Sequence, residues 1–351
     1  MAKSHPVVDE LKILLKSRKD LKSALESAIT NARLPEYFSD LQSFYAFVEK
    51  TVVQVPKHSN EMMQMDIAFY YVLSISPDEI LFKDPEFQQW TRDYTNAWAD
   101  FLNTDASTGE LQSYIDDPSF RIGEYQEGPS GWHSFNQFFA RQPKPGMRPL
   151  AKLDDPAVVL SPCDFSLMQP LMDISDDATV TIKGGITLKI SELLKDCRHN
   201  DAFNGGSLLS GFLKISDYHR FHSPIGGKVV ESRKIPGRIG LTIERDHEKG
   251  ILKAAPKPGF QFNQDRGVMV IDSPEMGLVG LLPVGMAQIS SVVITAEEGV
   301  ELHKGAEFGY FQFGGSNMLM LTEKGRFSFD QSVLKKKHIL QGSAIGRACK
   351  A

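Results

Sequence analysis

The chain has 351 residues, of which 41% are hydrophobic and 24% are charged, as expected for a soluble globular protein of one large domain or two ordinary ones. This composition excludes fibrous, collagen-like and largely disordered proteins. The net charge is −5, so the chain has no basic excess for a broad nucleic-acid or anionic membrane surface, and we expect no nucleic-acid partner.

The sequence carries no signal for membrane insertion or secretion. Its longest nearly apolar run, residues 277–286, contains Pro283, whereas a membrane-spanning helix needs about 20 residues. The N-terminus lacks the apolar stretch of a secretory signal. The three cysteines, Cys163, Cys197 and Cys349, are odd in number and far apart, which predicts no disulfide framework. We therefore expect a cytoplasmic protein without a transmembrane segment.

Three helical patterns lie in the first third of the chain. Apolar residues recur at helical spacing over 11–29, and again over 41–48 behind a cap at Ser39 or Asp40. The third pattern, over 84–101, begins with an N-cap followed by proline and places aromatic residues on one face. These faces predict a helical core. A long connection rich in Gly, Ser, Asp and Pro follows at 105–130.

Beyond residue 130 the pattern changes to short β-branched runs separated by Gly and Pro, which predict strands. The expected strands or strand pairs cover 158–160, 179–190, 208–215, 228–235, 268–271, 277–294 and 307–321. Helical pattern is restricted there to 134–140 and 191–197. The predicted fold class is α+β, with a helical region at 1–130 and a β-rich, mostly antiparallel domain at 131–351.

A pair of histidines, His219 and His222, is the first candidate for chemistry. On a helical turn, two histidines three residues apart would face the same way and could bind zinc, act as a base, or pack beside the neighbouring aromatic residues. The cysteines lack the paired spacing of a structural zinc site, so we expect no metal.

Three further segments have both structural and chemical interpretations. Adjacent glycines before Ser316 predict a strand bulge, but a Gly315–Ser316 bond can also be attacked by its own hydroxyl group once a base removes the proton. Asp164 follows a predicted strand and would either cap a turn or orient a histidine. Residues 134–149 predict a short aromatic helix and then a rigid turn.

Together these four segments resemble the phosphatidylserine decarboxylase family of pyruvoyl enzymes, over about residues 131–351. Its proenzymes carry FF-x-R-x-x-KPG-x-RP, SP-x-DG and YHR-x-H-x-P segments and a C-terminal GS processing site. This chain departs from that pattern at Phe165, Gly314 and Asn317, where the family usually has Gly, Leu and Thr. The GGS variant and the N-terminal helical region are closer to a branch that includes fungal L-tryptophan decarboxylase.

The resemblance implies autocatalytic cleavage of a proenzyme between Gly315 and Ser316. His222, oriented by Asp164, would deprotonate Ser316, which would then become a covalent pyruvoyl group. That group would bind a substrate amine as a Schiff base and serve as electron sink while the α-carboxylate leaves. His219 would reprotonate the substrate carbon or steer the carboxylate, and no other cofactor is implied. The two cleavage products would stay associated, and a homodimer is left open.

Three functions remain open at this point. A free amino acid, aromatic ones first, is favoured as substrate by the acidic chain and the GGS variant. The alternative is phosphatidylserine decarboxylation at a membrane, with the basic helix at 11–29 as a peripheral anchor unless its face simply packs on the protein. The third is a non-catalytic lipoyl-like or phosphotransfer-like carrier, because the KG-x-E-x-G pattern at 304–309 also occurs in such domains.

Overall fold

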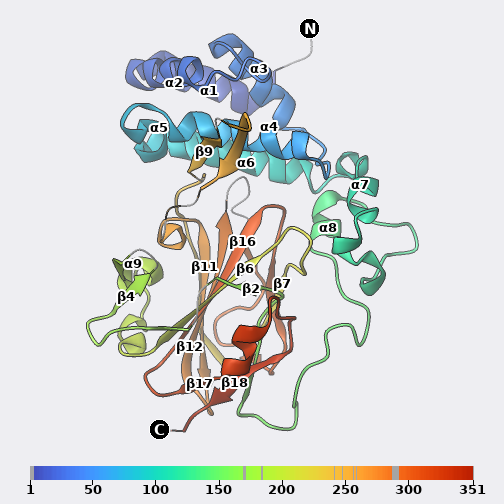
Figure 1. Ribbon diagram of the computed structural model, residues 1–351, viewed down its shortest axis with the longest axis vertical. Helices are drawn as coiled ribbons and strands as arrows, with labels where there is room; N and C mark the ends of the chain where they lie inside the picture. The colour runs from blue at the N-terminus through green and yellow to red at the C-terminus, as the bar shows by residue number, and fades with distance from the viewer. Residues whose placement is uncertain are drawn as a thin grey trace.

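The computed structural model describes residues 4–168, 171–182, 185–240, 242–246, 248–255, 257, 259–286 and 292–350. Helices gather at one end of the molecule and strands at the other (Figure 1). The predicted α+β class is confirmed. Residues 183–184 and 287–291, which fall in two predicted strand runs, lie outside the described residues, and the domain boundary near residue 130 stays a prediction.

Two of the predicted helices begin at the expected caps. The N-terminal helices are α1 (Pro6–Ser17), α2 (Lys19–Ala32), α3 (Leu41–Thr51), α4 (Asn60–Ser74), α5 (Ile80–Lys83), α6 (Pro85–Phe101) and α7 (Gln112–Ile115). The Asp40 carboxylate accepts from the Ser43 amide at α3, and the Asp84 carboxylate accepts from the amides of Glu86 and Phe87 at α6. Side-chain caps therefore begin both helices as the sequence predicts.

The predicted helix over 11–29 is two helices, because the backbone leaves helical geometry at Arg18 (φ −106°, ψ 87°). Its apolar residues Leu11, Leu21 and Leu25 are fully buried, and α1 and α2 pack against α6 and α4. The apolar face that a peripheral membrane anchor would use is therefore already part of the protein core.

The largest sheet is antiparallel throughout, in the order β14–β8–β11–β12–β16–β6–β2. Its strands are β14 (Glu301–Leu302), β8 (Gly227–Ile235), β11 (Arg266–Ser273), β12 (Gly277–Met286), β16 (Gly315–Thr322), β6 (Ser207–Leu213) and β2 (Ser166–Leu167), with β3 (Met172–Asp173) also paired to β6. Strand β16 carries Ser316 and lies between β12 and β6. The predicted cleavage site is thus in the middle of the sheet rather than at an edge.

The histidine pair lies at a smaller sheet of β13 (Val292–Ile294), β15 (Glu307–Phe311) and β7 (Arg220–His222). The helical turn considered for this pair is wrong, because His222 belongs to strand β7. The remaining elements are α8 (Phe135–Phe139), β1 (Val158–Leu160), the hairpin β4–β5 (Thr179–Ile182, Ile186–Lys189), α9 (Ile190–Leu194), the hairpin β9–β10 (Ile243–Asp246, Ile251–Ala254), β17 (Phe327–Phe329) and β18 (Ala344–Ala348).

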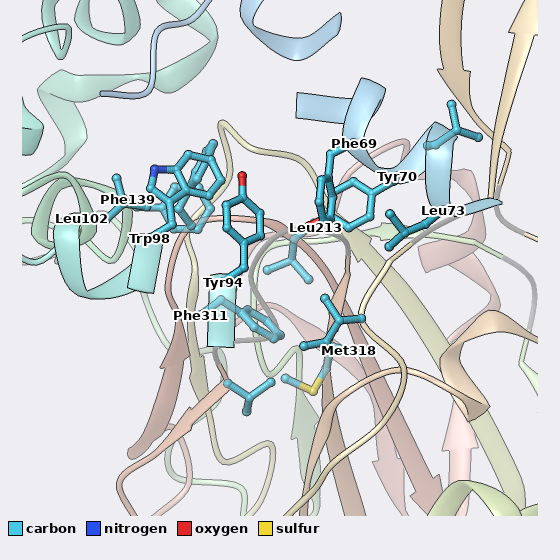
Figure 2. Packing of buried hydrophobic residues seen from close by; sticks show 14 of the residues in the cluster. Phe69, Tyr70, Leu73, Tyr94, Trp98, Leu102, Phe139, Leu213, Phe311 and Met318 are labelled. Carbon is cyan, nitrogen blue, oxygen red and sulfur yellow. The ribbon is translucent and has the colours of Figure 1, made fainter. Parts of the chain in front are cut away.

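One hydrophobic cluster joins the helices to the sheets. Phe69 and Trp98 from the helices lie above Leu213 and Met318 from the central strands (Figure 2). The β9–β10 hairpin extends toward the helices and is held to α4 through Gln64, whose side-chain amide exchanges two hydrogen bonds of 2.7 and 2.8 Å with the Leu252 backbone. The helical region is therefore packed directly over the end of the sheet that carries Ser316.

Two kinds of feature are absent from the described residues. No helix there combines the length and hydrophobicity needed to cross a bilayer. Across the same residues, His, Cys, Asp and Glu side chains form no group of three that could hold a metal ion.

Candidate active site

Ser316 is completely buried near the start of β16, opposite Gly285 on one side and Leu213 on the other. The residue two positions before it, Gly314, has φ 144°, a backbone conformation that side chains other than glycine rarely adopt. The leucine usual in the family at this position would be strained in this backbone. The GGS departure therefore matches the local conformation of the uncleaved chain.

His219 is the histidine that faces Ser316. Its Nδ1 lies 3.4 Å from Ser316 Oγ, and its Nε2 lies 3.2 Å from the carbonyl oxygen of Ile215. A carbonyl can only accept, so Nε2 carries the ring proton and Nδ1 presents its lone pair to the serine hydroxyl. A distance of 3.4 Å is long for a hydrogen bond to a hydroxyl, and such contacts commonly tighten during reaction.

The surroundings of His219 keep its ring neutral. Burial, and then the positive charge of Arg141, lower its pKa from 6.5 to about 3. The ring stacks on Phe139, with centroids 3.9 Å apart and planes 20° from parallel. Stacking and the Ile215 hydrogen bond together fix the orientation in which Nδ1 points at Ser316.

His222 has other partners. Its Nδ1 donates to the Gly305 carbonyl at 2.9 Å, which leaves Nε2 to accept from the Tyr218 hydroxyl at 2.8 Å. His219 lies just before strand β7 and His222 at its end, and the two rings contact different partners. The predicted contact between His222 and Ser316 is therefore absent from the described contacts, although burial lowers the pKa of His222 too.

Asp164 does not orient His222 directly. Its carboxylate is fully buried and accepts two hydrogen bonds from Arg148, at 2.9 and 2.7 Å, and a third from the Gln341 amide at 2.8 Å. A bidentate arginine and a backbone amide use most of the capacity of a carboxylate. The predicted Asp164–His222 hydrogen bond is replaced by these contacts, and Asp164 instead joins three separate segments of the chain.

Two segments that the sequence analysis noted without assigning them a part in the site, 134–149 and 304–309, contribute residues to it. The aromatic helix and rigid turn at 134–149 supply Phe139, which supports His219, and Arg148, which holds Asp164. Segment 304–309, which also suggested a carrier domain, supplies the carbonyl that binds His222. The periodic pattern alone does not reveal these roles, because each depends on contacts between distant segments.

Two of the residues that depart from the family pattern, Asn317 and Phe165, are buried. Asn317 is fully buried and its side-chain oxygen accepts from Ser210 Oγ at 3.4 Å. The Phe165 ring packs against Gly211, where an added Cβ would come within 2.4 Å of the ring. Phe165 is thus accommodated by a glycine on the neighbouring strand.

A cavity of about 390 Å³ opens beside the site, between α4 and residues 313–314. The sequence patterns did not predict this cavity, because they did not predict α4. Seven of the residues of α4 are buried, on more than one face, so the helix lacks the one-sided apolar stripe that reveals a surface helix.

The sequence pattern of the phosphatidylserine decarboxylase family matches residues 135–347. The chain belongs to this family. The predicted family is thereby confirmed, and the predicted enzyme class, a carboxy-lyase formed from a proenzyme, is the class of the phosphatidylserine decarboxylases.

The relatives differ in how much of the chain they share. Phosphatidylserine decarboxylase proenzyme 3 of Schizosaccharomyces pombe is 33% identical over 230 residues, which cover 65% of this chain and 23% of that protein. Decarboxylase iboD of Amanita muscaria is 27% identical over 318 residues, 81% of this chain and 91% of that protein. The phosphatidylserine decarboxylase proenzyme of Ruminiclostridium cellulolyticum is 29% identical over 72% of this chain and 83% of its own length. The chain thus spans about a quarter of the fission yeast protein.

Proposed function

We propose that this chain is a self-processing, pyruvoyl-dependent decarboxylase that removes the α-carboxylate of a free amino acid. The observation that carries this proposal is the buried Ser316 hydroxyl facing the free Nδ1 of a neutral His219. Family membership supports the reaction class, and the cavity beside Ser316 supports the small substrate. The residues present fit a pyruvoyl group, because a serine preceded by an unhindered glycine and faced by a base is what its formation requires.

In the processing reaction, His219 Nδ1 takes the Ser316 hydroxyl proton as the oxygen attacks the Gly315 carbonyl carbon. The peptide C–N bond breaks and an ester forms. Removal of the Ser316 Cα proton then breaks the ester C–O bond, which leaves Gly315 as a carboxylate and residue 316 as dehydroalanine. Tautomerisation and hydrolysis by one water release ammonia and complete the pyruvoyl group.

The assignment of His219 as base rests on contact geometry. His222 would have to break its hydrogen bonds to Gly305 and Tyr218 before it could reach Ser316. We propose instead that His222 positions the 304–309 segment and that Asp164 holds Arg148 and Gln341 around the site. This assignment of roles to His219, His222 and Asp164 differs from the one predicted from the sequence.

During turnover, a pyruvoyl group at residue 316 would supply an electrophilic ketone that accepts electrons as the carboxylate leaves. Residue 316 would remain beside His219, so the same ring is available to return a proton to the substrate carbon. Burial among Phe139 and the neighbouring strands excludes water from that proton transfer.

The cleaved pieces would stay together. The C-terminal piece, residues 316–351, contains β16, which lies between β12 and β6, and β18, which pairs with β1. Its Gln341 amide also binds Asp164 of the larger piece. Separation of the two pieces would require breaking the strand pairing of β16 and that of β18 at the same time.

Two observations favour a free amino acid over phosphatidylserine. Most apolar side chains of α1 and α2 are buried in the core, and Ile13 is the one large apolar side chain of these two helices that is exposed, so they offer little apolar surface to a bilayer. The similarity to iboD covers 81% of this chain and therefore includes part of the helical region, whereas the fission yeast proenzyme aligns over 65%. The similarity to iboD thus covers more of the helical region than the similarity to the fission yeast proenzyme does.

The test measures CO2 release by purified, cleaved protein from free amino acids without detergent, in parallel with phosphatidylserine vesicles. Release from an amino acid is the expected result. Release from vesicles alone would instead assign phosphatidylserine as the substrate. A Ser316→Ala chain, which cannot cleave, is the negative control for both assays.

A further inference from the structure

The cavity beside Ser316 is bounded by the helical region on one side and by the cleavage segment on the other. Its walls include Met62, Met63 and Asp66 of α4, together with Tyr114, Phe313 and Gly314. Its volume of about 390 Å³ lies within the range of small-molecule sites. Most of its lining is apolar, so a ligand there would place an apolar group against α4.

The cavity adjoins the two segments that hold the reacting residues. Gly314 lies two residues before Ser316, and Ile215, another wall residue, provides the carbonyl that binds His219 Nε2. After cleavage, residues 313–315 become the end of the larger piece, so this wall adjoins the new N-terminus at residue 316. A substrate attached there could extend its side chain into the cavity.

Polar groups at the outer part of the cavity already have partners. Lys57 lies 3.5 Å from Glu110, and His58 Nε2 lies 2.9 Å from Asp117, with all four side chains partly exposed. These pairs therefore have limited capacity for a ligand.

Asp66 differs from them. Its side chain is partly buried at the cavity wall. Within the described part of the chain its carboxyl group forms no hydrogen bond and no ion pair, and the protein around it raises its pKa. One turn further along α4, the buried Tyr70 hydroxyl is also without a partner among the described residues. Asp66 and Tyr70 line a second, smaller void together with Tyr94 and Trp98, which stand at the junction of helices and sheet (Figure 2). Two neighbouring polar groups thus have hydrogen-bonding capacity that the protein leaves unused.

We infer that this cavity is the substrate side-chain pocket and that Asp66 is its specificity-determining residue, selecting a largely apolar amino-acid side chain that carries a neutral hydrogen-bond donor. This inference rests on the proposed function. The apolar walls select the apolar part of the side chain, and the carboxyl group of Asp66, which has no partner among the described residues, selects the donor. A substrate without the donor displaces water from this partly buried carboxyl group without replacing its hydrogen bond, which lowers the relative efficiency of that substrate by about 10- to 100-fold.

The experiment compares two pairs of amino acids that differ only by a methyl group on the donor: tryptophan with 1-methyltryptophan, and tyrosine with O-methyltyrosine. The proteins are wild type, Asp66→Leu, Asp66→Asn and the matched control Glu61→Leu, which removes an exposed carboxylate on the same helix. Each is first checked for cleavage by mass, and kcat/KM is then measured for all four compounds.

The expected result is that wild type prefers the donor-bearing member of at least one pair by about 10- to 100-fold. Asp66→Leu should reduce this preference to within about threefold, Asp66→Asn should retain part of it because an amide oxygen still accepts, and Glu61→Leu should retain all of it. Calorimetric titration of the uncleaved Ser316→Ala chain provides a second readout, in which adding Asp66→Leu should weaken binding of the donor-bearing compound only.

An unchanged preference in Asp66→Leu, or a wild-type preference for the methylated compounds, would overturn the inference while leaving amino-acid decarboxylation intact. Release of CO2 from phosphatidylserine alone would overturn both the inference and the proposed substrate class. The two failures are therefore distinguishable.

Discussion

Replacing His219 by glutamine should slow self-cleavage far more than the same replacement at His222. The change removes the only imidazole nitrogen described near Ser316, whose Nδ1 lies 3.4 Å from the hydroxyl oxygen. Loss of a general base costs about 10²- to 10⁴-fold in rate, or about 3–5 kcal/mol in activation free energy. His222→Gln removes hydrogen bonds to Gly305 and Tyr218 but no contact with Ser316, so we expect less than about a tenfold effect, corresponding to roughly one hydrogen bond.

The assay follows cleavage from the moment of synthesis. Wild type, His219→Gln, His222→Gln and Ser316→Ala chains are made by cell-free translation, and the appearance of the piece containing residues 316–351 is timed by mass spectrometry. Ser316→Ala sets the uncleaved baseline, and circular dichroism confirms that the variants fold. Rapid cleavage of His219→Gln together with a blocked His222→Gln would refute the geometric assignment and restore the division of roles predicted from the sequence.

Three further predictions follow from the same contacts. In the uncleaved Ser316→Ala chain, the native state binds fewer protons than the unfolded state between pH 3 and 6.5, because the pKa of His219 falls from 6.5 to about 3. This stabilising contribution is complete above pH 6.5 and is lost as the pH falls, by at most about 1.4 kcal/mol per pH unit. Adding His219→Gln should therefore flatten the decline of the urea midpoint between pH 6 and 4. An unchanged decline would contradict the assignment of a neutral His219 ring. Arg148→Ala should destabilise the chain by about 1.5–3 kcal/mol, because buried Asp164 loses its bidentate partner and keeps only the Gln341 amide and Arg121 at 3.6 Å. A loss below about 1 kcal/mol in urea unfolding would show that Arg121 or water replaces Arg148. The two cleavage products should co-elute in native gel filtration and separate only in denaturant, because β16 is paired on both sides, whereas separate elution in buffer would contradict that association.

The fold was predictable where local chemistry determines it. Capping residues Asp40 and Asp84 begin helices as expected, and the β-branched runs at 158–160 and 228–235 form strands β1 and β8. The break at Arg18 was not predictable from the apolar spacing, because Leu14 and Leu21 keep the same helical phase across it. Helix α4 was missed because it is buried on several sides and lacks a polar face.

The site was predictable in composition but not in geometry. Short segments identified Ser316, the two histidines and Asp164, but not which of their atoms meet. The contacts of the two histidines depend on where strand β7 begins and ends. The partner of Asp164 is Arg148, which lies sixteen positions away along the chain. Asp66 carries no sequence signal, since its importance arises from the absence of a described partner inside a cavity built by distant segments.

Intact mass measurement of the purified wild-type protein tests the central claim most directly. Cleavage between Gly315 and Ser316 predicts a C-terminal piece of residues 316–351, roughly 4 kDa or one tenth of the 39.1 kDa chain, whose blocked N-terminus has the mass of a pyruvoyl group in place of serine. Ser316→Ala should remain at full length. A single 39.1 kDa species from wild-type protein, unchanged on prolonged incubation, would contradict the account.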